Sequence, residues 1–204
     1  MAAPRDPRVF VERLEDRIEK FVSGRDRVAL AFSGGLASTL LAMIARKRCD
    51  LRCLVAGQGR SVDIRAAKEA KTYFDFRVDF IALGNRAIRG ISERIAQANR
   101  DLSFSVVRAL VPIRAVLDQW PNGPVLAGFH SRATKGPIAK TLRAWNVRTP
   151  LADLARGRKL SRSTLQAAAI SLGLPAEWAR VVHRGPAAGA GIQGAFRMTG
   201  NMRG

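Results

Sequence analysis

The 204-residue chain is long enough for one well-packed domain. Apolar residues make up 47% of it and are spread along its length, which argues against disorder, and no apolar run approaches the ~20 residues of a membrane span. Lys and Arg number 35 against 16 Asp and Glu, a net charge of +19. This excess indicates a polyanionic partner (RNA, DNA or a nucleotide) or an arginine-rich compositional habit.

Helices and strands alternate along the chain. Apolar side chains at helical spacing predict a helix over 8–22, and a short buried strand over 27–32 runs directly into a Gly-Gly turn. The further predicted elements are, in order, a helix over 36–46, a buried strand over 51–56, a helix over 62–73, a strand over 76–83, helices over 86–98 and 103–119 with an interruption near Pro112, a short strand over 124–128 and a helix over 164–172.

This alternation with short loops predicts a parallel sheet covered on both faces, an α/β fold in the form of a three-layer, Rossmann-like α/β/α sandwich. Ligands of such folds lie at the carboxyl ends of the strands. We predict an N-terminal helix over 1–24, a nucleotide-binding domain over 25–183 and a Gly/Ala-rich basic tail over 184–204. The tail is either disordered or a flexible arm that closes over a ligand.

The turn after the first strand is the most informative part of the sequence. It reads Ser33-Gly34-Gly35, and a helix follows at once. Two glycines allow a tight turn and close approach of the backbone to an anion, and the helix start offers free N–H groups with a positive dipole. Hydroxyls at Ser38 and Thr39 add donors. The loop is therefore predicted to hold a nucleotide polyphosphate, although it matches neither the P-loop nor the dinucleotide-binding pattern.

The two cysteines, Cys49 and Cys53, stand in a CxxxC spacing with no further Cys or His nearby. That pattern favours two buried thiols over a disulfide or a metal site. The first residues, 1–7, have no apolar stretch behind them and do not predict a signal peptide. A reducing cytoplasm is the expected location.

Segment 28–41, VALAFSGGLASTLL, resembles the PP-loop of the ATP pyrophosphatase superfamily, whose pattern is a strand followed by Ser-Gly-Gly-x-Asp-Ser. The resemblance implies an adenine nucleotide alpha hydrolase-like fold that binds ATP with Mg²⁺, cleaves it between the α and β phosphates and adenylates an acceptor. Weaker similarities to the synthetase domain of asparagine synthetase, particularly its short archaeal relatives, lie in 57–63, 149–154, 159–162 and 184–193.

The resemblance also assigns roles to residues. Those implied to bind the nucleotide are Ser33, Gly34, Gly35, Leu36, Ala37, Ser38 and Thr39 at the phosphates, and Val55, Ala56, Gly57 and Gly128 around adenosine. Ser38 and Lys159 are implied to act in catalysis, Lys159 by neutralising pyrophosphate, although a solvated lysine explains it equally.

The chain departs from the family at its acidic positions. Ala37 stands where the loop has Asp, and 128–133 replaces an acid-rich run, so the predicted Mg²⁺ site is weakened and we name no metal ligand. These 204 residues contain no stretch that resembles the glutaminase half of the family, so nitrogen is expected to come from free ammonia or a partner's product. Asp63 is expected to cap its helix, or to touch ribose or magnesium.

Other charged residues near the expected site stay open. His130 is a candidate acid or base, and Arg132, Lys135 and Lys140 are expected to contact a phosphate or to be solvated. Three functions follow: an adenylating, asparagine synthetase-like amide-forming enzyme, a tRNA-modifying enzyme that uses the same activation, or a non-catalytic module for ATP or AMP. The acceptor is unknown, and a homodimer is compatible with the sequence.

Overall fold

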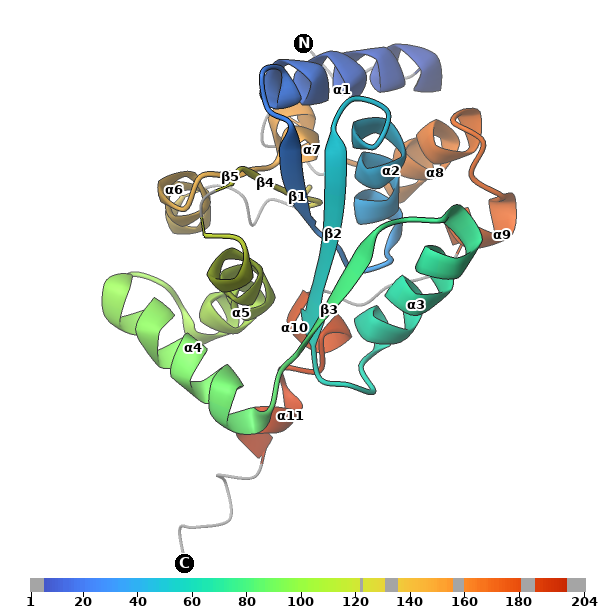
Figure 1. The fold of residues 1–204 in the computed structure, drawn as a ribbon. Coiled ribbons are helices and arrows are strands. Elements are labelled where there is room, and N and C mark those ends of the chain that lie inside the picture. Colours follow the sequence, from blue (N-terminus) through green and yellow to red (C-terminus); the bar gives the residue numbers. More distant parts are fainter. Residues whose placement is uncertain (1–5, 122, 131–135, 156–159, 181–185, 198–204) are drawn as a thin grey trace, which may run out of the picture.

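The computed structural model describes residues 6–121, 123–130, 136–155, 160–180 and 186–197 (Figure 1). Within them, five strands form one sheet in the order β3-β2-β1-β4-β5, and every neighbouring pair is parallel. The strands are β1 (Arg27–Ala31), β2 (Asp50–Gly57), β3 (Val78–Ala82), β4 (Val125–Ala127) and β5 (Val147–Arg148). In the central strand, Ala31 pairs with Leu54 on one side and with Ala127 on the other. The predicted parallel α/β fold is confirmed.

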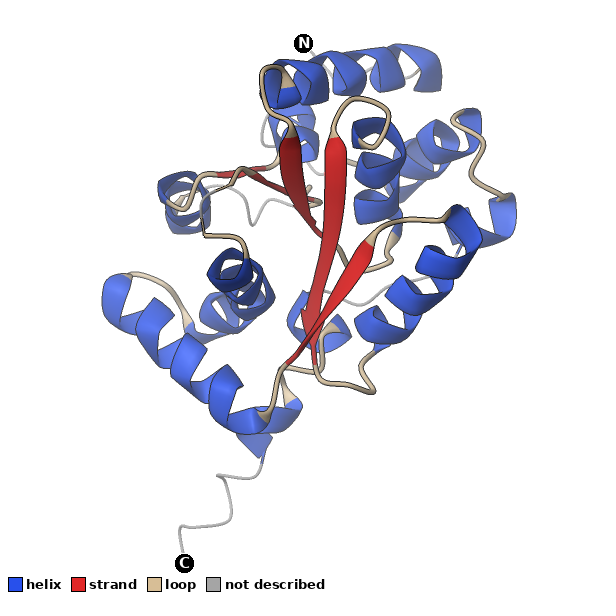
Figure 2. Ribbon diagram, viewed as in Figure 1, coloured by secondary structure: helices blue, strands red, loops and turns tan. Residues whose placement is uncertain are grey.

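Helices cover both faces of the sheet (Figure 2). They are α1 (Pro7–Val22), α2 (Leu36–Ala45), α3 (Val62–Phe74), α4 (Asn85–Ala98), α5 (Phe104–Gln119), α6 (Pro137–Ala144), α7 (Pro150–Ala155), α8 (Arg162–Ser171), α9 (Ala176–Arg180), α10 (Pro186–Gly189) and α11 (Gly194–Arg197). One core cluster joins the sheet to α1, α2, α3 and α8, and a second joins it to α4, α5 and the C-terminal segment. The sheet is therefore the middle of three layers, as an α/β sandwich requires.

Four parts of the chain differ from the sequence prediction, one of them being α9, where no helix was predicted. Helix α5 runs without a break through Pro112, although proline removes one hydrogen bond of the helix, so the predicted interruption is wrong. Residues 136–155 form α6, β5 and α7, for which the sequence predicts nothing. In the predicted tail, the described residues form α10 and α11, which contact α5 and α4 respectively.

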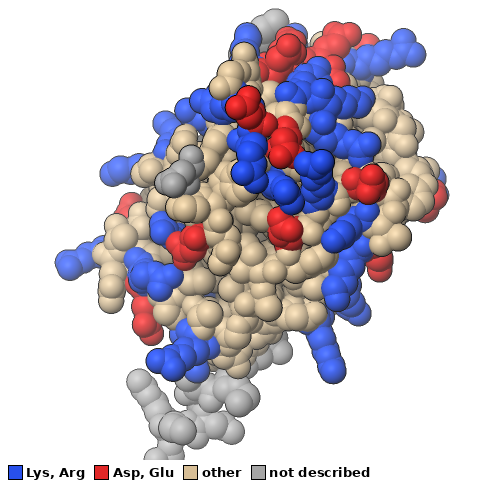
Figure 3. Space-filling model, viewed as in Figure 1, with Lys and Arg blue, Asp and Glu red and all other residues tan. Residues whose placement is uncertain are grey.

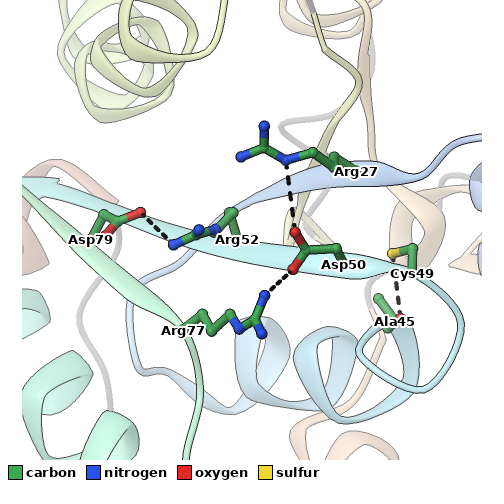
Figure 4. Close-up of polar contacts among 7 residues, drawn as sticks. All are labelled: Arg27, Ala45, Cys49, Asp50, Arg52, Arg77 and Asp79. Carbon is green, nitrogen blue, oxygen red and sulfur yellow. Dashed lines mark hydrogen bonds and ion pairs between the residues drawn. The ribbon is translucent and has the colours of Figure 1, made fainter.

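Charged side chains near the amino ends of the first three strands pair with one another (Figure 4). The Arg77 guanidinium lies 2.7 Å from the Asp50 carboxylate, Arg27 lies 3.7 Å from the same carboxylate, and Arg52 lies 3.8 Å from Asp79. Exposed pairs of this kind add little stability. On the face shown in Figure 3, basic side chains are spread widely, and acidic side chains lie among them.

Both cysteines, near these pairs, are free thiols. Cys53 is buried on β2, where desolvation raises its pKa to about 12, and half-buried Cys49 has a pKa raised for the same reason. A raised pKa keeps the thiol protonated and therefore unreactive. Among the described helices, none has the length and apolar character that crossing a membrane requires.

Candidate functional site

The sheet order places a crevice at the carboxyl ends of β1 and β4. From β1 the chain proceeds outward on one side through β2 and β3, and then returns to add β4 and β5 on the other side. The connections that leave β1 and β4 therefore diverge, and the gap between them is where open α/β sheets bind ligands.

A cavity of about 530 Å³ lies at this switch point. That volume is within the range of pockets for small molecules and cofactors. Its described lining residues are Ala31, Phe32, Ser33, Gly35, Leu36, Ala37, Ser38, Leu54, Ala56, Asp63, Pro112, Ile113, Val116, Ala127, Gly128, Phe129, His130, Arg162, Leu165 and Pro186. The predicted phosphate loop and the ends of three neighbouring strands therefore face one space.

The loop between β1 and α2 owes its path to Gly34. This residue has φ +68°, in the left-handed region, and a Cβ built on it would fall 2.5 Å from the Ala66 carbonyl carbon and 2.7 Å from the Ala67 nitrogen. Only glycine combines that dihedral with so close an approach to a neighbouring backbone. The loop is therefore packed directly against the first turns of α3.

Serine hydroxyls fix the shape of the loop from inside. The Ser38 hydroxyl donates to the Gly35 carbonyl at 2.9 Å and accepts from the Ser33 N–H at 3.3 Å. The Ser33 hydroxyl lies 3.1 Å from that of Ser38 and accepts from the Gly35 N–H at 3.2 Å. These bonds satisfy the hydroxyls within the loop and hold the backbone ready for a ligand.

The start of α2 leaves backbone donors unused. Gly35 caps the helix without a side-chain hydrogen bond, and the first bond of the helix runs from the Thr39 N–H to the Gly35 carbonyl at 2.9 Å. Within the described residues, the N–H groups of Leu36 and Ala37 have no acceptor. Both residues line the cavity. Free N–H groups at a helix start form an anion site.

The cavity has a polar half and an apolar half. Ser33, Ser38 and Arg162 belong to the loop and to the starts of α2 and α8, on the sheet face covered by α1, α2, α3 and α8. The opposite wall carries apolar side chains of the other core cluster, and these are Leu54, Ala56, Ile113, Val116 and Ala127. An anion therefore fits one half and a flat apolar ring fits the other.

Not every residue predicted for the site reaches the cavity. Ser33, Gly35, Leu36, Ala37, Ser38, Ala56 and Gly128 line it, whereas Gly34, Thr39, Val55 and Gly57 do not. Val55 faces the opposite core because side chains alternate along a strand, and Leu54 takes its place at the cavity. Thr39 is 2% exposed, and its hydroxyl has no hydrogen-bond partner among the described residues. Lys159, Arg132 and Lys135 lie outside the described residues, and Lys140 is exposed on α6.

Several lining residues were not among those predicted from the sequence. They are Pro112, Ile113 and Val116 of α5, Leu165 of α8, and Pro186 of α10. Arg162 also joins the wall, and its guanidinium donates to the Arg180 carbonyl at 2.6 Å. These residues come from helices far along the chain, and no local sequence pattern points to them. Leu54 of β2 also lines the cavity, and the alternation of side chains along a strand could have predicted it. His130 lines the cavity as expected from its place after β4.

Asp63 is the only carboxylate among the described residues of the wall. It lies in the first turn of α3, whose N-cap is Ser61, and its side chain forms no hydrogen bond or ion pair with a described residue, so the expected capping role is not observed. Asp63 is 5% exposed, and burial raises its pKa to about 7. Desolvation penalises the charged form, and no described group offsets that cost.

Asp63 should make the ligand-free protein less stable as pH rises. A folded-state pKa of about 7 against the ordinary 3.8 means that the favourable protonated form is lost between about pH 4 and pH 7. Asp63→Asn removes this loss. Because the folded and unfolded pKa values differ by about 3 units, the variant should be more stable than the wild type by roughly 4 kcal/mol at pH 8, and by much less near pH 4.5. Urea unfolding with a chelator at both pH values measures the difference. Glu69→Gln, an exposed position on the same helix, is the matched control, and equal pH profiles for wild type and Asp63→Asn would contradict the assignment.

Solved structures share the fold, and two of them are NAD synthetases. The NH3-dependent NAD synthetase from Campylobacter jejuni, in complex with nitrate ion, superposes with a TM-score of 0.55 and 16% identity, over 87% of this chain and 78% of that one. The NAD+ synthetase from Burkholderia pseudomallei gives a TM-score of 0.58 and 17% identity, over 89% of this chain and 72% of that one. No protein-family model and no curated protein matches the sequence. At 16% and 17% identity, the similarity establishes the fold alone, so the activity has to be inferred from the residues of the site.

Proposed function

We propose that this protein is a PP-loop ATP pyrophosphatase that activates a carboxyl group as an acyl adenylate and forms an amide from it. The observation that carries the proposal is the divided cavity, in which the unused N–H groups of Leu36 and Ala37 face the same space as an apolar wall. ATP has the matching division, an anionic polyphosphate at one end and a flat adenine at the other. Both structural neighbours are NAD synthetases, and the one from Campylobacter jejuni is NH3-dependent, which supports ammonia as the nitrogen source.

The chain's own residues would hold ATP in one orientation. Adenine would pack against Ala31, Ala56 and Ala127 at the strand ends, where small side chains leave room for a ring. The β and γ phosphates would accept hydrogen bonds from the start of α2. Arg162, at the start of α8, would neutralise the charge that develops on pyrophosphate.

The reaction would proceed in two steps. A carboxylate oxygen of the acceptor attacks the α-phosphorus, the bond from that phosphorus to the bridging oxygen breaks, and pyrophosphate leaves. Ammonia or an amine then attacks the carbonyl carbon, AMP leaves, and the surplus proton of the nitrogen passes to solvent. An asparagine synthetase-like reaction, in which the acceptor is the side-chain carboxylate of aspartate, is one form of it. The proposal does not depend on which carboxylic acid is the acceptor.

Product analysis tests the proposal. The protein is incubated with ATP, Mg²⁺, ammonium and a panel of carboxylic acids, and nucleotides and phosphates are separated by chromatography. We expect AMP and pyrophosphate in equal amounts, dependent on one acid and absent with Gly34→Ala. ADP and phosphate as the products would contradict cleavage between the α and β phosphates.

RNA is a second candidate acceptor, favoured by the charge around the crevice. Segments 58–65 and 83–89, which follow β2 and β3 and include the starts of α3 and α4, carry Arg60, Arg65, Arg86 and Arg89. The one acid within these segments, Asp63, is buried, and the next acids along the two helices, Glu69 and Glu93, are exposed. Binding of tRNA should weaken steeply with salt if the rim contacts phosphates. Absence of tRNA binding at low salt would remove this candidate.

A further inference from the structure

The cavity contains a buried acid in the half that suits phosphates. Asp63 is 5% exposed, lines the cavity and has no hydrogen-bond or ion-pair partner among the described residues. Natural structures rarely bury a carboxylate without a partner, because the loss of hydration is costly. Its partner is therefore expected to arrive with a ligand.

The location of Asp63 follows from the packing of the loop on α3. Gly34 lies against Ala66 and Ala67. These residues stand three and four positions after Asp63, so all three share the helix face that meets the loop. The carboxylate is thus on the phosphate side of the cavity.

In a cavity shielded from water, a carboxylate and a polyphosphate repel each other strongly unless a cation lies between them. Arg162 is the only Lys or Arg among the described wall residues. Its position at the start of α8 provides one positive charge, against the several negative charges of ATP and Asp63 together.

We propose that Asp63 is the protein ligand of the divalent cation that accompanies the nucleotide phosphates. The proposal rests on the proposed function, because the phosphates supply the remaining ligands. Mg²⁺ prefers oxygen, and at phosphate sites it needs one or two carboxylates together with phosphate oxygens and water, so a single orphaned carboxylate fits. The described residues contain no group of three or more His, Cys, Asp or Glu that could hold a metal ion, so phosphate oxygens and water would have to supply the other ligands. When bound, the cation neutralises phosphate charge.

The C-terminal segment holds this carboxylate in place. A Cβ on Gly189 of α10 would overlap the Asp63 carboxylate, so the backbone of α10 passes directly over it. The Gln58 N–H donates to the Ala190 carbonyl at 3.0 Å and ties the segment to the loop that leads into α3. This contact excludes water from one side of Asp63 and restricts the side chain to the cavity.

Calorimetry of ATP binding with and without Mg²⁺ tests the proposal on the full chain. For the wild type we expect ATP to bind at least about tenfold more tightly with Mg²⁺ than with a chelator. A tenfold change in affinity is about the effect of one contact to a charged group. In Asp63→Asn this ratio should fall to within about twofold of one, while metal-free ATP binds more tightly than to the wild type because the repulsion is gone. Asp63→Ser should behave alike, which guards against a folding defect in either variant, and Glu69→Gln should keep the wild-type ratio.

The outcomes separate the two proposals. A wild-type ratio retained in Asp63→Asn, or equal binding by the wild type with and without Mg²⁺, overturns the role of Asp63 and leaves the nucleotide site intact. A loss of affinity in Asp63→Asn under both conditions assigns the residue a structural role and also overturns it. A wild type that binds ATP under neither condition overturns the proposed function itself.

Discussion

Gly34→Ala is expected to lower the affinity for ATP at least about 100-fold, roughly 3 kcal/mol. The left-handed dihedral of +68° costs alanine about 1–2 kcal/mol. The larger effect is steric, because the new methyl group would overlap the backbone of Ala66 and Ala67 and push the loop away from α3. The N–H groups at the start of α2 would then no longer point at the phosphates. Calorimetry with ATP and urea unfolding measure the two losses.

Gly24→Ala is the matched control for the dihedral alone. Gly24 has φ +70°, and a Cβ there would meet no atom within 4 Å. This variant should lose about 1 kcal/mol of stability and bind ATP as the wild type does. Equal effects of the two substitutions on ATP affinity would contradict the role given to the contact between the loop and α3.

Ala31→Phe is expected to abolish binding of ATP and AMP alike, with at least about a 100-fold loss of affinity, because a phenyl ring would fill the apolar half of the cavity. Ala31 ends the central strand and is half-buried at the wall. Pyrophosphate, which needs only the loop, should bind within about threefold of the wild-type affinity. Competition between a fluorescent adenine nucleotide and each ligand measures the difference.

Ala96→Phe, on the exposed face of α4, controls for the added ring. Thermal unfolding of both variants separates blocked binding from overpacking, which costs typically 1–3 kcal/mol. Loss of pyrophosphate binding in a folded Ala31→Phe protein would contradict the division of the cavity into two halves.

The sequence predicted those parts of the site whose signals are local. A buried strand, two glycines and a following helix define the loop from Ser33 to Ser38 with little need of the rest of the chain. The alternation of helices and strands likewise predicted the parallel sheet, and the carboxyl ends of its strands as the ligand edge. Such signals are read over a few residues, and tertiary contacts did not change them.

The other wall residues depend on contacts between distant segments. Asp63 stands in the first turn of an ordinary amphipathic helix, and only the later passage of Gly189 over it makes the carboxylate buried. Pro112 gave a helix-breaking signal, yet α5 continues past it, and its neighbours Val111 and Ile113 are buried in the core. Val55 does not line the cavity for a local reason, because the side chains of Val55, Ala56 and Gly57 cannot all face one side of the sheet.

The most direct test of the account is a crystal structure with an ATP analogue that carries a methylene group between the α and β phosphates. We predict adenine against Ala31, Ala56 and Ala127, with the β and γ phosphates on the N–H groups of Leu36 and Ala37. A nucleotide bound elsewhere on the protein, or with its phosphates directed away from the start of α2, would contradict the account.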